Sequence, residues 1–302
     1  MGILGVLASH LAAIRAELGL GGAALLADPV PVANGGTGGA SAAAARSNLG
    51  IAPRTTPYFN NATLDAISSD CVQYFKMDEG IGALIHDCVN GGWNRVSSVA
   101  SGLGTWATSI PGSAGYTLSG NANNWFSGAS PSTAGHGAFR LNQTAGSEFS
   151  LNFWLKLTDA TPAALSPLAG VNPDSGTTAL CVLATLATSG AVNLYSQGST
   201  RVTSSTLLQD NTLYMITLVN RTVTATPTWF LYLNSVEEGS STSGANTANP
   251  ITQGTHVTVG TGGGAGTSAA GTTIGQVSLW KRALSASEIS ALYNGGTGRW
   301  PL

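Results

Sequence analysis

The chain has 302 residues, of which 12 are Lys or Arg and 14 are Asp or Glu, so its formal net charge is -2. Charged residues are 9% of the chain, against about 25% in an ordinary domain, and 43% of the residues are apolar. A nucleic-acid-binding protein is excluded because it needs a basic surplus, and a disordered chain because it needs more charge and fewer apolar residues. The 40 glycines follow no three-residue period, which excludes a collagen.

The N-terminal residues carry an apolar pattern two heptads long. Five apolar side chains are spaced by three, four, three and four positions, as in a coiled-coil seam: Leu4, Leu7, Leu11, Ile14 and Leu18. Two heptads are marginal on their own, so we expect this seam to pack against its own copies in an oligomer or against another protein. A helix packed on its own domain is the alternative.

The first 27 residues are apolar overall, but they do not read as a membrane segment. His10, Arg15 and Glu17 interrupt the run, so it is too broken to span a bilayer. It also lacks the basic region that opens a secretion signal. We therefore expect no membrane insertion and no secretion.

A glycine- and alanine-rich element follows at residues 27–51. Two prolines favour an extended entry, Asn34–Gly39 favours a turn, and Ser41 can cap a short alanine helix that ends at Leu49–Gly50. The stretch Val32–Ile51 resembles the glycine-threonine-glycine, alanine-rich, Asn-Leu-Gly motif of bacteriophage tail fibres and related tail appendage proteins. This resemblance implies a trimeric fibre shaft or a point of attachment.

Residues 52–70 are predicted to be a linker, because prolines and asparagines break any periodicity there. From Cys71 onward the pattern is that of β-strands, most clearly where apolar and polar residues alternate from Phe149 to Leu157. Six other runs resemble strands: Val72–Lys76, Ala179–Leu186, Leu213–Val219, Trp229–Asn234, His256–Gly260 and Thr273–Lys281. We therefore predict an attachment and oligomerisation segment with its linker at residues 1–65 and one all-β domain at residues 66–302, since many strands without intervening helices favour a sandwich or jelly roll.

The chain closes with a helix signal. Ser285 to Glu288 forms a capping box, Leu284 and Ile289 fall at the positions of a hydrophobic staple, and Asn294 with the following glycine ends the helix. We expect a short C-terminal helix docked on the sandwich.

This ending resembles the closing signature of laminin-G-like, concanavalin-A-like jelly rolls. The segments that match the family, in its order, are Tyr74–Gly80 with Asp87, Glu148–Trp154, Tyr214–Val219, Leu231–Asn234 and Val277–Tyr293. The resemblance implies an antiparallel β-sandwich jelly roll with a short C-terminal helix. It implies no single activity, because the fold serves lectins, adhesion modules, glycanases and spacers alike.

The carboxylates do not form the pattern of a glycan-cleaving enzyme, which needs two of them across a cleft. The pairs Asp78–Glu79 and Glu237–Glu238 are adjacent, so their side chains would point to opposite faces, and we interpret both as solvated turn residues. The four histidines show no metal-ligand spacing. We expect no catalysis and no cofactor, with one alternative left open: calcium held by oxygen ligands from Asp78, Asp87 and Asp174.

Three tryptophans and their asparagine neighbours lie in loop-like sequence and are candidates for sugar binding, because sugars stack on aromatic rings and bond to amides. The candidates are Trp93, Asn94, Trp106, Asn123, Asn124 and Trp125. The alternative is that each tryptophan anchors its own loop. The cysteines Cys71, Cys88 and Cys181 are expected to be small buried residues, with a Cys71–Cys88 bridge as the alternative.

Together these observations predict a non-enzymatic receptor-binding protein of a virion tail. Its N-terminal part would form a homotrimer and attach to other tail or baseplate proteins, and its jelly roll would bind a host surface glycan or protein. Two alternatives stay open: a structural virion component without a ligand, and a polysaccharide-degrading enzyme.

Overall fold

A computed structural model describes most of the C-terminal three-quarters of the chain. The described residues are 61–77, 84–86, 88–89, 93–95, 105–110, 113–118, 126–127, 148–173, 182–196, 199–221, 227–242, 255–260 and 270–299. All of them belong to one unit of the chain, Thr56–Leu302. The predicted seam from Leu4 to Leu18 and the glycine-rich element at 27–51 lie outside the described residues, so both stay predictions.

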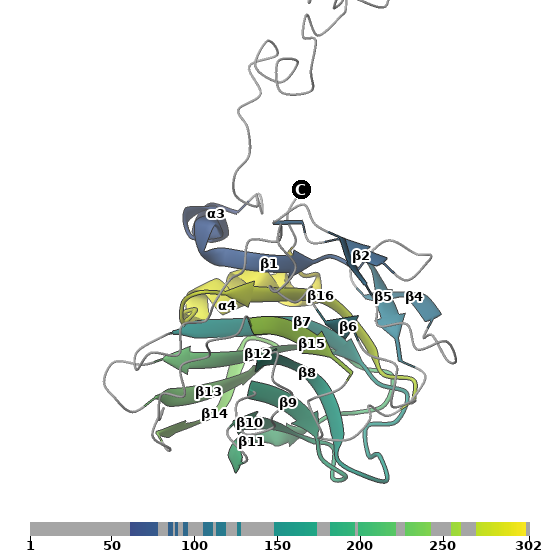
Figure 1. Cartoon of the computed structure of the whole chain (residues 1–302). Helices are drawn as coiled ribbons and strands as arrows, with labels where there is room; N and C mark the ends of the chain where they lie inside the picture. Colours follow the sequence, from purple (N-terminus) through teal and green to yellow (C-terminus); the bar gives the residue numbers. More distant parts are fainter. Residues whose placement is uncertain are drawn as a thin grey trace, which may run out of the picture. The chain divides into compact units, whose positions relative to one another are not determined.

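Two antiparallel sheets form the domain (Figure 1). The larger has the order β14-β13-β12-β7-β16-β5-β4, and β1 also pairs with β16. Its strands are β1 (Cys71–Phe75), β4 (Thr105–Ile110), β5 (Ser113–Thr117), β7 (Phe149–Lys156), β12 (Leu213–Arg221), β13 (Thr228–Leu233), β14 (Val236–Thr242) and β16 (Thr273–Trp280).

The smaller sheet has the order β11-β10-β9-β8-β15-β6. Its strands are β6 (Phe126–Ser127), β8 (Ser166–Pro173), β9 (Val182–Leu186), β10 (Ala191–Ser196), β11 (Ser199–Leu207) and β15 (Thr255–Val259). A separate pair joins β2 (Leu84–His86) to β3 (Trp93–Arg95). The seven predicted runs coincide with β1, β7, β9, β12, β13, β15 and β16, so the predicted antiparallel sandwich is confirmed.

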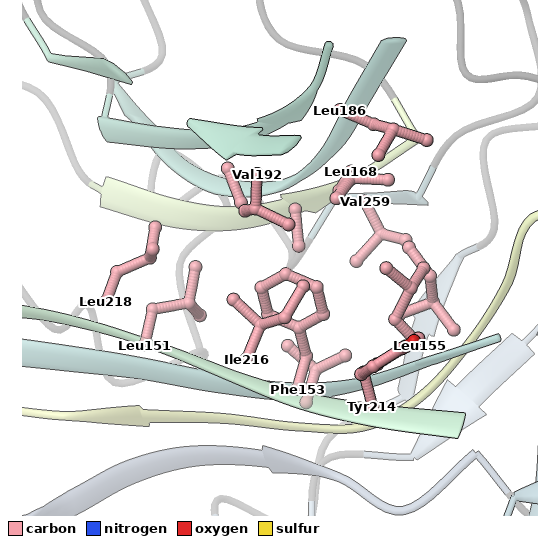
Figure 2. Packing of buried hydrophobic residues seen from close by; sticks show 14 of the residues in the cluster. Leu151, Phe153, Leu155, Leu168, Leu186, Val192, Tyr214, Ile216, Leu218 and Val259 are labelled. Atoms are coloured by element: carbon pink, nitrogen blue, oxygen red, sulfur yellow. The ribbon is translucent and has the colours of Figure 1, made fainter. Parts of the chain in front are cut away.

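The hydrophobic core lies between the two sheets. Alternate residues of β7, among them Leu151, Phe153 and Leu155, are fully buried there. Figure 2 shows them facing Leu186 and Val192 of the smaller sheet. The two sheets cover each other's inner faces. The period-two pattern of β7 therefore places its apolar residues in the core, where burial stabilises the fold.

The other face of the larger sheet is covered by two helices, α3 (Ala62–Ala66) and α4 (Ala286–Tyr293). Leu64 of α3 and Ile289 of α4 are fully buried with Trp280 in a second apolar cluster. The prediction of a linker is therefore wrong for residues 61–70. Asn61 caps α3 by accepting from the Leu64 N–H at 3.1 Å, and this helix packs on the domain. The predicted boundary between residues 65 and 66 falls inside this helix.

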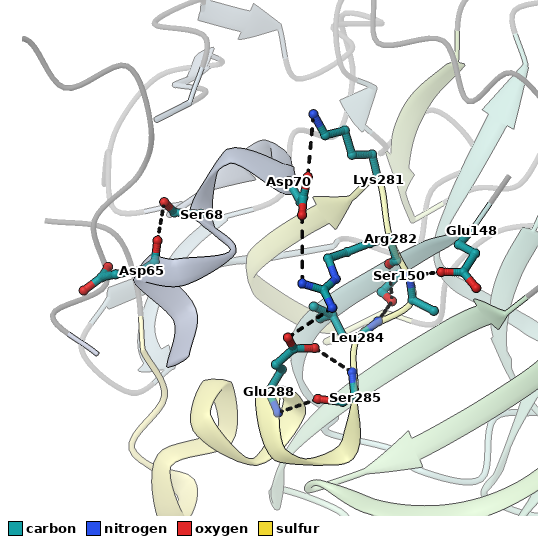
Figure 3. Close-up of polar contacts among 11 residues, drawn as sticks. Asp65, Ser68, Asp70, Glu148, Ser150, Lys281, Arg282, Leu284, Ser285 and Glu288 are labelled. Carbon is teal, nitrogen blue, oxygen red and sulfur yellow. Dashed lines mark hydrogen bonds and ion pairs between the residues drawn. The ribbon is translucent and has the colours of Figure 1, made fainter. Parts of the chain in front are cut away.

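Helix α4 begins with the predicted capping box (Figure 3). The Ser285 Oγ accepts from the Glu288 N–H at 3.3 Å, and the Glu288 Oε2 accepts from the Ser285 N–H at 2.7 Å. Asn294 ends the helix in a left-handed conformation, with φ 48°. Arg282 lies between Glu288, at 3.3 Å, and Asp70, at 3.9 Å, and so ties the short 3-10 turn after α3 to the start of α4.

The described cysteines test one simpler expectation. Neither Cys71 nor Cys88 forms a disulfide; Cys71 is buried, as expected, whereas Cys88 is half-buried, and Cys181 lies outside the described residues. Within the described part of the chain, no helix is long and apolar enough to cross a membrane.

Strands β13 and β14 form a hairpin whose two turn residues, Asn234 and Ser235, have φ 50° and 67°. Positive φ at both positions gives the turn whose twist matches paired strands. Glu237 and Glu238 therefore lie in β14, so the predicted turn position is wrong for this pair; Glu237 is exposed, as predicted, and Glu238 is half-buried.

Glu238 joins the two sheets through β11. Its carboxylate accepts from the Ser205 N–H at 3.0 Å, the Ser205 hydroxyl at 2.8 Å, the Thr206 N–H at 2.9 Å and the Thr206 hydroxyl at 2.8 Å. Desolvation raises the pKa of Glu238, but these hydrogen bonds from Thr206 and Ser205 outweigh it, so the pKa is lowered from 4.5. A carboxylate with a lowered folded-state pKa stabilises the fold above its ordinary pKa.

Replacing Glu238 with glutamine is expected to lower the midpoint of thermal unfolding at pH 7 by about 2–4 °C. The gap between the two proteins should close as the pH falls below 4.5 and through the lowered folded-state pKa, because the wild-type carboxylate then becomes protonated. Thermal unfolding monitored by circular dichroism from pH 7 to pH 3 measures this. Glu237→Gln, one residue away, is the matched control, and a gap of constant size at all pH values would contradict the assignment.

Candidate functional site

The outer face of the smaller sheet, the side turned away from the core, carries a compact set of polar residues. In β9, Val182, Ala184 and Leu186 belong to the core cluster, so Thr185 and Leu183 between them point outward. We call the outward residues Thr185, Asn193, Tyr195, Arg201 and Thr203 the polar face.

Strand register brings the polar face together from segments far apart in sequence. Asn193 of β10 lies opposite Thr185 of β9 on one side and Thr203 of β11 on the other. The Thr203 hydroxyl donates to the Asn193 Oδ1 at 2.8 Å, so the Asn193 amide keeps its two N–H donors for another partner. The three residues form one polar row across three strands.

A second row runs beside the first. Tyr195 lies opposite Leu183, and Leu183 lies opposite Gly170 of β8. A Cβ at Gly170 would meet the Leu183 Cδ1 at 2.8 Å, so the leucine side chain extends over the bare glycine. Tyr195 is half-buried, and its phenol therefore lies next to an apolar floor.

Burial changes across the polar face. Leu183 and Thr185 have relative exposures of 0% and 1%, Asn193 and Tyr195 are half-buried, and Thr203 is exposed. The polar face thus runs from buried groups on β9 to accessible groups on β11. A ligand can therefore reach the groups on β10 and β11, whereas the groups on β9 are shielded from it.

Two buried polar atoms of the polar face lack hydrogen-bond partners. They are the Thr185 Oγ1 and the Arg201 Nε. Leaving a buried donor or acceptor unpaired costs about 1–3 kcal/mol, so such groups are rare in native proteins and call for a reason. Both atoms are shielded from solvent, so a ligand would reach this face through the exposed Thr203 and the half-buried Asn193, Tyr195 and Arg201 instead.

Arg201 owes its position to a bulge. Leu194 pairs with Val202 and Tyr195 with Thr200, so Arg201 is an extra residue of β11 beside Tyr195. Val202 belongs to the core cluster, and by alternation Arg201 points to the outer face. Bulges commonly re-aim a side chain near a binding site.

A cluster of charged and aromatic groups on the larger sheet is already paired. On the larger sheet, the Arg221 guanidinium lies 5.0 Å from the Phe230 ring centre, and the Tyr232 hydroxyl donates to Glu237 at 3.2 Å. Desolvation, and then the neighbouring charge of Glu237, raise the pKa of Tyr232. This cluster is satisfied internally, so it offers less to a ligand than the polar face does.

The structure places only part of the predicted site. Trp93 and Asn94 lie in β3, opposite His86 and Ile85 of β2. Trp106 lies in β4, is half-buried and packs its ring edge-on against Tyr116, with ring centres 5.2 Å apart. Asn123, Asn124 and Trp125 lie outside the described residues, as do the predicted calcium ligands Asp78, Asp87 and Asp174. Both sets stay predictions.

The described candidates, Trp93, Asn94 and Trp106, do not lie with the polar face. The sequence patterns did not predict the residues of the polar face. Thr185, Asn193 and Thr203 are residue types that are common at solvent-facing positions of a strand. The one signal that could have directed attention to this region is Arg201, a lone charge in a long polar run. Among the described residues, no group of three His, Cys, Asp or Glu side chains gathers to hold a metal ion.

Solved structures similar to this chain include binding domains of toxins. The binding domain of Paraclostridial Mosquitocidal Protein 1 matches with a TM-score of 0.53 and 16% identity, covering 76% of this chain and 52% of that one. The botulinum neurotoxin serotype G binding domain matches with a TM-score of 0.53 and 13% identity, covering 75% of this chain and 51% of that one. This chain thus spans about half the length of these binding domains. A Trypanosoma rangeli sialidase in complex with the inhibitor DANA matches with a TM-score of 0.52 and 15% identity, covering 83% of this chain and 37% of the sialidase.

These identities are low, so the structural matches show a shared fold only. A search of curated protein sequences gives no significant match. A family model described as the concanavalin A-like lectin/glucanases superfamily matches residues 131–290, which is more than half of the chain. With the antiparallel two-sheet sandwich and its closing helix already in place, this match shows that the chain belongs to the laminin G-type branch of the concanavalin A-like lectin/glucanases superfamily.

Proposed function

We propose that this chain is a non-enzymatic receptor-binding protein whose jelly roll binds a glycan or a protein on a host surface. The observation that carries the proposal is the polar face, where a half-buried tyrosine, an asparagine with available N–H donors and a half-buried arginine lie on one side of a single sheet. The toxin binding domains of similar fold support it, since their names describe a binding role for the same architecture.

The finer part of the proposal concerns the setting. The chain acts in a bacteriophage-type virion tail, where residues 1–65 form a homotrimer and attach it to tail or baseplate proteins. The support is the resemblance of Val32–Ile51 to tail appendage proteins and the heptad seam from Leu4 to Leu18. Trimeric display raises the avidity of a weak site by orders of magnitude.

The test measures mass and binding on the same preparations. Light scattering is expected to give three chains per particle for the full chain and one chain for a variant lacking residues 1–51. Both proteins are then applied, fluorescently labelled, to a glycan array and to a panel of bacterial cells. We expect the full chain to bind a defined glycan or strain, and the truncated variant to bind the same target more than tenfold more weakly, because it loses avidity.

Three outcomes would contradict this proposal. A full-length chain that is a monomer would contradict the proposed homotrimer and would indicate that the N-terminal seam packs against a different protein. Failure of a full-length trimer to bind any glycan or cell would favour a purely structural component. A polysaccharide shortened on incubation with the chain would contradict the non-enzymatic assignment.

A further inference from the structure

We infer that the ligand of the polar face is an acidic glycan, and that Arg201 binds its carboxylate. This inference rests on the proposed function and deepens it, because it names the charge of the ligand and the residue that recognises it. Three observations carry it: the charge of the sheet, the state of the arginine and the groups around it.

The first observation is that Arg201 is a lone charge. Among the strands that the structure describes in the smaller sheet, β6, β8, β9, β10, β11 and β15, Arg201 is the only Asp, Glu, Lys or Arg. No carboxylate of this sheet can neutralise it. The carboxylate of Glu238 reaches β11 from β14, and it is held there by Ser205 and Thr206.

The second observation is the state of the guanidinium. Arg201 is half-buried, its Nε is buried without a hydrogen-bond partner, and no ion pair joins it to a described residue. An arginine stays charged at every physiological pH, so its charge is partly desolvated without compensation. Partial desolvation strengthens an interaction with an incoming anion. The planar fork of N–H donors matches the two oxygens of a carboxylate.

The third observation is that the neighbours suit a sugar. Tyr195 lies beside Arg201 through the bulge, and Asn193 and Thr203 supply amide and hydroxyl groups on the same side of the sheet. Rings and hydroxyls of this kind bind the two faces of a sugar ring. The accessible groups lie on the neighbouring strands β10 and β11, one strand spacing or about 5 Å apart, so they suit one acidic unit of a longer glycan.

The experiment compares matched pairs of oligosaccharides that differ only in charge. The probes are two such pairs, oligogalacturonate and 3′-sialyllactose each with its methyl ester, and a sulfated lactose as a second type of anion. They are immobilised and exposed to the full-length chain. We expect the chain to bind at least one carboxylated probe about ten- to a hundredfold more strongly than its neutral partner, which corresponds to one hydrogen-bonded charge pair. The preference should weaken at higher salt.

The variants assign the preference to one residue. Arg201→Gln should reduce binding of the carboxylated probe to the level of the neutral one, and Arg201→Lys should restore part of it. Arg221→Gln removes an arginine from the other sheet, where it lies on Phe230, and should leave the preference unchanged. Unfolding midpoints within about 2 °C of the wild type for the three variants show that folding is intact, since a surface substitution changes stability little.

Each result has a distinct meaning. Wild-type binding of neutral probes as strong as that of carboxylated ones overturns the acidic-glycan inference and leaves the proposed function standing. Binding of the sulfated probe as strong as that of the carboxylated ones overturns the assignment of a carboxylate as the recognised group. A carboxylate preference that Arg201→Gln does not reduce overturns the assignment of Arg201. Absence of binding to all probes overturns the inference, and the proposed function fails with it only if the cell panel is also negative.

Discussion

Replacing Trp280 with alanine is expected to destabilise the domain by about 3–5 kcal/mol. The Trp280 side chain has 0% exposure and lies in the cluster that joins α3 and α4 to the larger sheet. The substitution would leave a cavity there and would remove the hydrogen bond from the Trp280 Nε1 to the Ser278 Oγ, which is 3.0 Å long. Since natural domains have only about 5–15 kcal/mol of stability, urea unfolding should show a large shift of the midpoint.

Two further variants separate the ring from the hydrogen bond. Trp280→Phe keeps most of the buried ring, and its loss of stability should be less than half that of Trp280→Ala. Ser278→Ala removes the hydrogen-bond acceptor with little change of volume. Hydrogen exchange of the Trp280→Ala protein should increase most in α3 and α4, because both helices pack on this cluster. A loss of stability below 1 kcal/mol for Trp280→Ala would show that the helices are held by other contacts.

Gly170→Ala is expected to lower stability although alanine is normally the better choice. Gly170 does not have the positive φ that glycine favours, and at such positions alanine usually stabilises a protein by about 0.4–1 kcal/mol. Here the added Cβ would lie 2.5 Å from the carbonyl oxygen of Val182 in the neighbouring strand and 2.8 Å from the Leu183 Cδ1. A clash with backbone cannot be relieved by a rotamer change, so we expect a loss of about 1–3 kcal/mol or more.

Gly239→Ala is the matched control for this prediction. Its Cβ would meet only a side-chain atom, the Val202 Cγ1, at 3.1 Å, so a small shift accommodates it. Thermal and urea unfolding of the two variants should therefore differ clearly, with the larger loss at residue 170. Equal effects would mean that β8 and β9 can separate slightly without cost. Because Leu183 extends over Gly170, the substitution at 170 should also weaken glycan binding on the polar face.

Strand β7 shows how far the sequence determines the fold and where other information enters. The alternation from Phe149 to Leu155 predicts a strand with one apolar face, and the structure confirms that strand. The same pattern suggests that Ser150 and Asn152 face solvent, yet their exposures are 0% and 3%. Ser150 bonds to the Arg282 carbonyl and the Leu284 N–H, and Asn152 bonds to Thr217. Their partners come from distant segments, and local periodicity does not report such contacts.

The helix at the start of the domain was missed for a related reason. Residues 61–70 are short and polar, and a five-residue helix has little propensity of its own. What stabilises it is the burial of Leu64 and Ile67 against α4 and the sheet, together with the Asn61 cap. Tertiary packing of this kind cannot be read from the window in which the helix lies.

The polar face could not be predicted from the sequence for a different reason, because each of its residues is of a type common in strands. Thr185, Asn193 and Thr203 become a row only through the registers of β9, β10 and β11, which depend on the bulge at Arg201. The sequence reasoning instead favoured tryptophans in loop-like segments, because large aromatic rings are visible in a sequence without knowledge of pairing. The positions that residues take in a pairing register are not visible in a sequence in this way.

The bonds of Glu238 also bear on how copies of this domain behave when crowded together. β14 and β11 are the terminal strands of their sheets, and an exposed terminal strand can pair with a strand of another chain and start aggregation. The carboxylate occupies the N–H groups of Ser205 and Thr206, so an invading strand would have to displace it from β11. In the proposed homotrimer, where three jelly rolls would lie close together, this glutamate on each copy would help to keep neighbouring sandwiches from pairing into a continuous sheet.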